Sequence, residues 1–71
     1  MAVNYQAVKS SDISEVGYDA DTQTLYVRFN SGAEYAYDGV PPEEHENLVN
    51  AGSVGSALND SIKGQYPYRR V

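Results

Sequence analysis

Cysteine and tryptophan are absent from this 71-residue chain, which holds a single phenylalanine and a single methionine. Without cysteine the fold has neither a disulfide nor a thiolate metal site, so its stability must come from packing alone. Apolar runs stay well short of the ~20 residues that a membrane-spanning helix needs. The segment from Met1 to Tyr5 lacks the charged and apolar regions of a secretory leader. We therefore expect a small soluble protein located in the cytoplasm.

Basic side chains are also scarce, with five Lys and Arg against ten Asp and Glu. Residues 1–60 hold all ten acids and two of the bases, which leaves a formal charge of −8. Residues 61–71 hold three bases and no acid, which gives +3. Because affinity for nucleic acid depends mainly on the number of phosphates neutralised, this distribution allows only weak binding. The five bases are Lys9, Arg28, Lys63, Arg69 and Arg70.

The chain length corresponds to one small domain, for which a stability on the order of 3–5 kcal/mol is typical. Residues 1–10 show no clear periodicity, and we expect them to be loosely ordered, with a single domain over residues 11–71. Seven tyrosines supply most of the large rings. Since a tyrosine must satisfy its hydroxyl, these rings are expected at the margins of the core.

The centre of the chain predicts a β-hairpin. Residues 24–29 alternate between apolar and polar side chains, and residues 33–37 return after a three-residue loop that ends in Gly32. Glycine suits the end of such a loop because a positive φ is needed there. The register that keeps both strand faces consistent pairs Phe29 with Ala33, Val27 with Tyr35, Leu25 with Tyr37, Arg28 with Glu34 and Tyr26 with Ala36.

Apolar spacing predicts one more strand and two short helices. The strand covers residues 13–18, and Gly17 within it marks a bulge or a close backbone approach. The first helix starts at Pro42 and ends with Gly52 as its C′ residue, and the second covers residues 53–63. A proline near the end keeps the last residues extended. The predicted fold is therefore α+β, a three-stranded antiparallel β-meander followed by two short helices packed on one face, with an extended C-terminal tail.

A series of residues has an order and spacing that one known family shares. It includes Ile13, Val16-Gly17-Tyr18-Asp19, Thr22, Leu25, Val27, Phe29, Gly32, Val40-Pro41, Leu48, Ala51-Gly52-Ser53, Gly55, Asn59, Ile62 and Tyr66-Pro67-Tyr68. With a central Tyr-any-Tyr motif, here Tyr35-Ala36-Tyr37, these residues resemble the KTSC domain over about residues 10–70.

The KTSC domain is named for the C-terminus of some lysyl-tRNA synthetases and occurs more often as a lone small protein of bacteria and phages. The resemblance implies no established activity. It does imply RNA binding as a suggested role, because the domain is attached to a tRNA synthetase.

Two groups of aromatic side chains are candidates for a binding site. Tyr35 and Tyr37 could stack on bases, but their register places them on the apolar strand face, so we interpret them as core or core-edge residues. Residues 66–70 interleave rings with guanidinium groups, a pattern typical of nucleic-acid binding. The alternative is a strap whose rings pack on the body and whose arginines pair with acids. The candidate nucleic-acid site comprises Arg28, Lys63, Tyr66, Tyr68, Arg69 and Arg70.

The sequence assembles no catalytic or metal site. His45 is the only histidine, and its neighbours Glu44 and Glu46 diverge on a helix, so a structural histidine is expected. The Asp19-Ala20-Asp21 segment begins like a calcium loop but lacks the central glycine and has Asn30 at its twelfth position, so a turn is favoured. The chain has neither a nucleophile elbow nor a phosphate-binding glycine loop. We expect no enzyme activity, no metal and no cofactor.

The sequence therefore predicts a non-catalytic binding module that contacts RNA weakly through its C-terminal Tyr/Arg segment. The alternative is a structural or protein–protein interaction module without a nucleic-acid role, which self-associates through a sheet edge or its tyrosine-rich surface. Neither hypothesis involves a membrane. Added salt separates them, because binding through cations weakens with salt and a tyrosine-lined protein interface does not.

Overall fold

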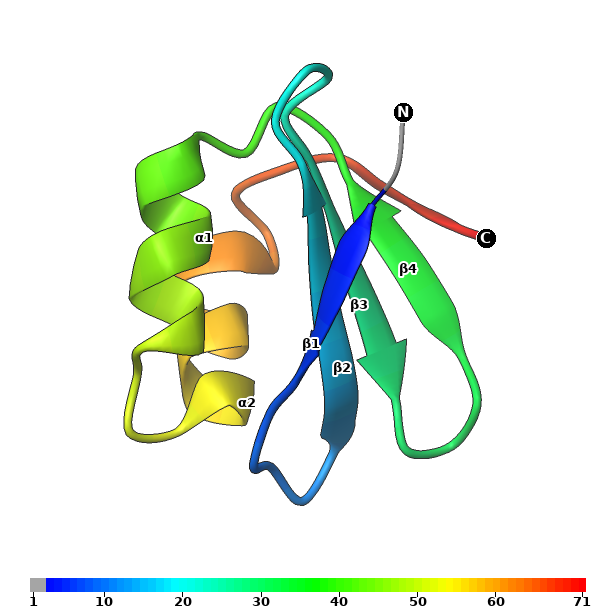
Figure 1. The fold of residues 1–71 in the computed structure, drawn as a ribbon, viewed down its shortest axis with the longest axis vertical. Helices are drawn as coiled ribbons and strands as arrows, with labels where there is room; N and C mark the ends of the chain where they lie inside the picture. The colour runs from blue at the N-terminus through cyan, green and yellow to red at the C-terminus, as the bar shows by residue number, and fades with distance from the viewer. Residues whose placement is uncertain (1–2) are drawn as a thin grey trace.

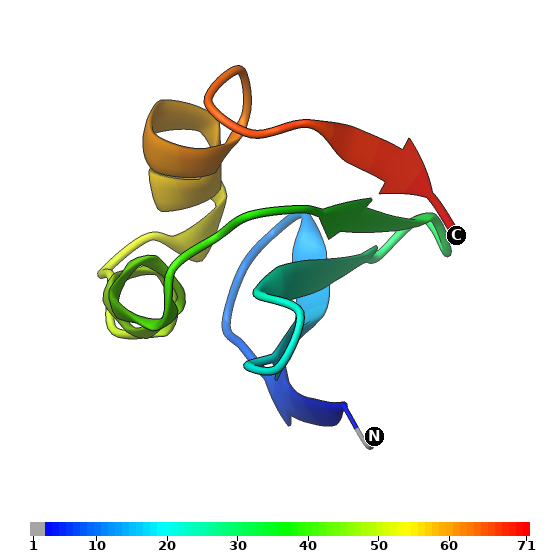
Figure 2. The same cartoon turned by 90° about the horizontal axis from the view of Figure 1, so that it is seen from above.

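The computed structural model of the chain describes residues 3–71 and has an α+β fold with two layers. Within this range, five antiparallel strands form one sheet in the order β1-β2-β3-β4-β5, and the helices lie together on one side of it (Figures 1 and 2). The elements are β1 (Asn4–Ala7), β2 (Ile13–Asp19), β3 (Thr24–Phe29), β4 (Glu34–Tyr37), α1 (Pro42–Val49), α2 (Val54–Ala57), the π-helical turn η1 (Leu58–Ile62) and β5 (Tyr68–Arg70).

The β3–β4 hairpin has the register that the sequence predicts. Its pairs run from Leu25 opposite Tyr37 to Arg28 opposite Glu34. Gly32 has a φ of +96°, the left-handed conformation that the end of the loop requires and that glycine adopts without strain. Because a shift by one residue would exchange the two faces of a strand, this register also decides which side chains face the helices.

The sheet has two strands more than the three that the sequence predicts. Residues 4–7 pair with β2 as one edge strand, and residues 68–70, expected as an extended tail, pair with β4 as the other edge strand. The burial of these two strands does not alternate along the chain, because both lie at an edge and are largely exposed. Alternation of apolar and polar residues is the main sequence signal of a strand; residues 68–70 lack it, whereas residues 3–7 show it over a short stretch.

Gly17 allows a close approach between β1 and β2. A Cβ atom at this position would lie 2.9 Å from Cδ2 of the Tyr5 ring and 2.8 Å from Cγ1 of Val3. Close approach is therefore the correct one of the two interpretations, while the irregularity in the ladder lies between Ile13 and Glu15. The absence of a side chain lets the Tyr5 ring lie over the sheet.

The first helix, α1, begins at Pro42 as expected, with Glu43 and Glu44 in its first turn. Acidic side chains there stabilise the helix, because they lie at the positive end of its dipole. Its C-cap is Asn50, whose backbone φ of −93° and ψ of −2° stay in the right-handed region. The C′ residue is therefore Ala51, and the prediction of Gly52 at this position is wrong.

The second helical segment runs from Val54 to Ile62 and changes from an α-helix to a π-helix at Leu58. Ser53 caps its start by accepting a hydrogen bond from the Ser56 amide at 3.3 Å. From Leu58 onward the turn widens to a π-helix, whose wider spacing is seen in the 2.8 Å hydrogen bond that the Lys63 amide donates to the Leu58 carbonyl. This turn keeps the side chains of Leu58 and Ile62 on the buried face.

The hydrophobic core lies between the sheet and the helices. Side chains from the strands meet side chains from α1, α2 and η1, and all of them are almost completely inaccessible to solvent. The core residues are Ile13, Val16, Leu25, Val27, Tyr37, Val40, Leu48, Val54, Leu58 and Ile62.

Helices long and apolar enough to cross a membrane are not found among residues 3–71.

Candidate functional site

A groove with aromatic walls opens between the outer strands of the sheet and the end of the second helical segment. Its volume is about 350 Å³, and β3, β4, β5 and the residues after η1 all contribute to it. Side chains alternate between the faces of a strand, so the ring-bearing positions of β4 and β5 share the face that the helices cover in part. We name this site the aromatic groove; its lining residues are Phe29, Tyr35, Tyr37, Lys63, Gly64 and Tyr68.

The rings of the aromatic groove form a continuous row. The ring centroids of Phe29 and Tyr35 lie 5.7 Å apart at an interplanar angle of 77°, and those of Tyr35 and Tyr68 lie 5.7 Å apart at 80°. Tyr68 also contacts Tyr37, with 5.7 Å between centroids. Tyr37 is 3% exposed, Tyr35 is half-buried and Tyr68 is 65% exposed. The row therefore leads from the core to the solvent.

The two tyrosines of the Tyr-any-Tyr motif thus have different surroundings. Tyr37 is part of the core, and burial raises the pKa of its hydroxyl above the ordinary value, with the neighbouring Tyr68 and Tyr35 hydroxyls acting in the same direction. Tyr35 packs against the core from its edge and lines the aromatic groove. Only the outer part of this row is available to a ligand.

Two cations accompany the aromatic groove. The Nζ atom of Lys63 lies 5.5 Å from the centroid of the Phe29 ring, within the range of a cation–π contact. Arg70 is exposed and lies opposite Tyr35 in the β4–β5 pairing, on the same face of the sheet. A second hollow of about 310 Å³ shares Phe29 and Lys63 with the groove. Its remaining lining residues are Ser11, Asp12, Asn30 and Ser31.

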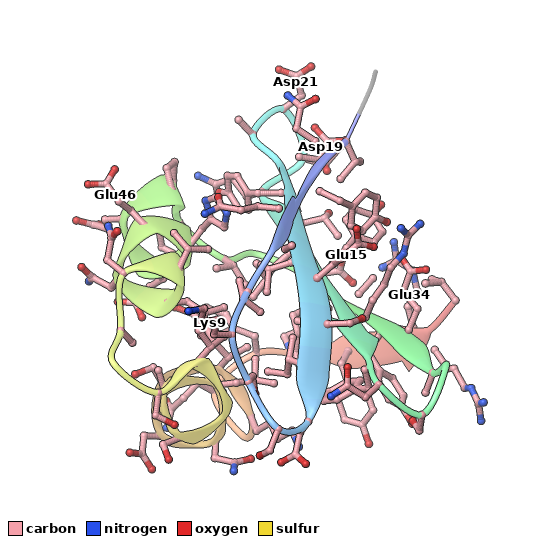
Figure 3. The ribbon with its side chains drawn as sticks, turned by 60° about the horizontal axis from the view of Figure 1, so that its bottom comes forward. Lys9, Glu15, Asp19, Asp21, Glu34 and Glu46 are labelled. Carbon is pink, nitrogen blue, oxygen red and sulfur yellow. The ribbon has the colours of Figure 1, made fainter. Side chains whose placement is uncertain are left out.

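Arg28 and Arg69, predicted for the same site, lie on the opposite face of the sheet. The Nη1 atom of Arg28 is 2.9 Å from the Glu15 carboxylate, and its Nε atom is 3.2 Å from Glu34. Both acids project away from the helices in Figure 3. The Nη1 atom of Arg69 is 2.6 Å from the Asp38 carboxylate. Strand alternation therefore separates Arg69 from Tyr68 and Arg70, although the sequence predicts one site for all three.

A hydrogen-bonded network covers the sheet face that points away from the helices. The guanidinium Cζ of Arg28 lies 3.7 Å from the centroid of the Tyr5 ring, and the Tyr5 hydroxyl donates a hydrogen bond to Glu34. Burial, together with the carboxylate of Glu34, raises the pKa of Tyr5 to about 12. The Tyr5 hydroxyl, helped by Arg28, lowers the pKa of Glu34. Arg28 is thus held by carboxylates of this chain.

Sequence reasoning did not single out Phe29 or Gly64 as site residues. Phe29 ends the alternating apolar series of β3, and only the tertiary structure shows that it borders the groove. Tyr66, a predicted site residue, is half-buried against the core. One sequence signal does point to the groove: the strands end in more aromatic side chains than two short helices can cover.

His45 belongs to the packing between α1 and β2. Its ring stacks on Tyr18 with 4.7 Å between centroids and an interplanar angle of 7°. Burial lowers the pKa of His45, although the nearby Glu46 acts in the opposite direction. Three His, Asp or Glu side chains that could together hold a metal ion are not found among residues 3–71.

Lowering the pH from about 7.5 to about 5.5 is expected to reduce the stability of the domain modestly. The folded-state pKa of His45 lies below its unfolded value, so the unfolded state binds more protons in this window and stability is lost as the pH falls through about 6.5. Urea denaturation at several pH values measures the effect. A His45→Phe variant keeps the stacked ring and should lose this pH dependence; an unchanged dependence would assign it to another group.

The chain shares its sequence pattern and its fold with a known protein family. Residues 9–66 match the family model of the KTSC domain, so the chain belongs to the KTSC domain family. A KTSC domain protein from Yersinia pestis, known from a crystal structure, is 37% identical and has a TM-score of 0.95 over 99% of both chains. These matches confirm the resemblance that the Tyr-any-Tyr motif and its surrounding residues indicate.

Two further relatives show the settings in which this domain is found. An uncharacterized protein from Stutzerimonas stutzeri is 44% identical over 66 residues, which are 92% of this chain and 93% of that protein. A lysine–tRNA ligase from Nostoc punctiforme is 40% identical over 63 residues, which are 89% of this chain but 11% of the ligase. The chain thus corresponds to a small part of that ligase and to nearly all of the first relative.

Proposed function

We propose that this KTSC domain is a non-catalytic module that binds single-stranded RNA weakly in the aromatic groove. The observation that carries the proposal is the row of rings from Phe29 to Tyr68 beside Lys63 in one hollow. Stacking of a base on an aromatic side chain contributes roughly 1–3 kcal/mol and tolerates any base, because every base has a flat face. A nearby ammonium group attracts the phosphate that accompanies the base.

The distribution of charge supports weak rather than tight binding. Residues 1–60 carry a formal charge of −8, which repels a long polyanion. Of the predicted cations, Lys63 and Arg70 lie on the groove side, whereas Arg28 and Arg69 are paired with carboxylates on the other face. Two cations can neutralise only a few phosphates, so the salt dependence of binding should be shallow.

The relatives add one argument for RNA. The same domain forms part of a lysine–tRNA ligase, an enzyme that acts on tRNA. A domain joined to that enzyme is held close to the tRNA that the enzyme binds. The effective concentration of RNA at the domain is then high, so even a weak RNA site on it becomes occupied. We propose the same ligand class for this chain.

Replacing Arg70 with alanine is expected to weaken binding of a single-stranded RNA octamer about 2- to 10-fold, the range set by the loss of one hydrogen bond. The plot of log affinity against log salt concentration should become shallower by about 0.7, the value for one lost phosphate contact. Arg70 shares its sheet face with Tyr35, so its guanidinium can reach a bound strand. Fluorescence anisotropy of a labelled octamer measures both changes.

The neighbouring arginine provides a matched control. Arg69→Ala removes the same side chain from the opposite face, where it pairs with Asp38. It should leave RNA affinity nearly unchanged and, because an exposed ion pair contributes little, should also leave thermal stability nearly unchanged. Equal effects of the two substitutions on RNA affinity would contradict binding at the groove.

Self-association is a second candidate function, and the exposure of β5 favours it. All three residues of β5 are exposed, and Tyr68 and Val71 are 65% and 57% exposed. An exposed edge strand with apolar side chains can pair with a second copy of itself. Sedimentation at increasing protein concentration tests this alternative, and added salt should hardly affect such a dimer.

A further inference from the structure

Two hollows lie side by side and share one wall. The aromatic groove, of about 350 Å³, and the second hollow, of about 310 Å³, are both lined by Phe29 and Lys63. Each is at the lower end of the roughly 300–1,000 Å³ of small-ligand sites, so each accommodates one small group rather than an extended strand. Building on the proposed function, we infer that the two hollows hold two consecutive nucleotides of single-stranded RNA, with the linking phosphate at Lys63.

The lining of the two hollows differs in a way that matches the parts of a nucleotide. The aromatic groove offers rings, which bind bases by stacking. The second hollow is lined mainly by serine, asparagine and aspartate, which can hydrogen-bond the hydroxyl groups of a ribose. Phe29, at the shared wall, offers its ring to a base on either side. The carboxylate of Asp12 repels a phosphate, whereas the ammonium of Lys63 attracts one, so the phosphate is placed at the shared wall.

Charge limits the footprint to these two nucleotides and one flanking phosphate. Outside the hollows, a strand would meet a body whose acids outnumber its bases. Of the three arginines, Arg28 and Arg69 lie on the opposite face, with their Nη1 atoms 2.9 Å and 2.6 Å from carboxylates, and Arg70 lies on the groove side. Further nucleotides therefore gain no stacking ring and at most one phosphate contact, at Arg70, while their other phosphates approach acidic side chains.

The test is a titration of the full chain, followed by NMR, with adenosine, the dinucleoside monophosphate ApA, and oligoadenylates of four and eight nucleotides. ApA carries one linking phosphate and adenosine carries none. We expect ApA to bind about tenfold or more tighter than adenosine, as a further stacked base and a phosphate contact predict. Divided by the number of binding registers, the affinity of the tetranucleotide should exceed that of ApA by no more than about 2- to 10-fold, the contribution of the one contact at Arg70. The affinity of the octanucleotide per register should differ from that of the tetranucleotide by less than about twofold.

Substitutions at lysine separate the phosphate contact from the stacking. Lys63→Ala should weaken ApA binding about 2- to 10-fold and leave adenosine binding unchanged, because only ApA has a phosphate to lose. Lys63→Arg keeps the charge and should restore ApA binding. Lys9→Ala is the matched control, since Lys9 lines neither hollow and belongs to the segment that connects β1 with β2 (Figure 3).

Each failure has its own meaning. If affinity per register continues to rise from the tetranucleotide to the octanucleotide, or if Lys63→Ala weakens adenosine binding as much as ApA binding, the two-nucleotide site is wrong while RNA binding stands. If Lys9→Ala weakens ApA binding as much as Lys63→Ala does, the phosphate is not at Lys63. If none of the four ligands shifts the resonances of groove residues, both the two-nucleotide site and the proposed function are overturned.

Discussion

Tyr37→Ala is expected to leave the domain largely unfolded at room temperature. The Tyr37 side chain is 3% exposed and packs in the core, opposite Leu25 in the central hairpin. Truncation of a buried aromatic ring costs about 3–5 kcal/mol, and a domain of this size has only about 3–5 kcal/mol to lose. The far-ultraviolet circular dichroism spectrum and a urea denaturation curve measure the loss.

Two variants show whether the ring itself is responsible. Tyr37→Phe keeps the ring and should stay within about 1.5 kcal/mol of the parent, the range of shape-conserving changes. Tyr35→Ala removes the half-buried partner in the same motif, which packs at the core edge, and should cost clearly less than Tyr37→Ala. A Tyr37→Ala protein with the parent's urea midpoint would contradict the placement of this ring in the core.

Gly17→Val is expected to displace β1 from the sheet and to lower the free energy of unfolding by about 1–3 kcal/mol. A Cβ atom on Gly17 would lie 2.9 Å from the Tyr5 ring and 2.8 Å from Val3, closer than side-chain atoms come to one another. The ring must move, and with it goes the hydrogen bond of the Tyr5 hydroxyl to Glu34. Urea denaturation gives the loss, and proteolysis near residue 5 reports the displaced strand.

Gly52→Val is the control for this prediction. Nothing lies within 4 Å of a Cβ atom on Gly52, so the same substitution meets open space there. Combining Gly17→Val with Tyr5→Ala should cost less than the sum of the two single changes, because the clash with the ring disappears. If valine at both glycines cost the same, the effect would come from backbone conformation and not from the Tyr5 ring.

The part of the fold that the sequence predicts correctly is encoded locally. Residues 24–37 alternate in polarity on both sides of a loop that ends in glycine, and only one register agrees with all of them. Pro42 likewise specifies the start of α1 by its fixed φ. Such signals involve residues that are neighbours along the chain, so they can be interpreted without tertiary structure.

The two edge strands differ in how far the sequence indicates them. Residues 68–70 have no alternation of their own and become a strand by pairing with β4, which is distant along the chain. Residues 3–7 do alternate apolar with polar side chains, but over a stretch too short to identify a strand without its partner β2. The candidate site suffers from the same limit. Only when residues 68–70 are known to be a strand does it follow that Arg69 and Arg70 point to opposite faces. Glycine commonly follows the end of a helix, so Gly52 indicates a longer α1 than the structure has, in which the helix ends at Val49.

The pairing of β4 with β5 differs from every other pairing in the sheet. Short loops connect the strands from β1 to β4, whereas the whole helical region lies between β4 and β5, so that Tyr37 meets Tyr68 across it. Long-range contacts of this kind form late in folding and open first, because the closure of a long loop opposes them. The wall of the groove that Tyr68 provides thus depends on the closure of this long loop. A ligand that packs on Tyr68 also stabilises the pairing of β5 with β4. Ligand binding and the folding of this edge strand therefore stabilise each other.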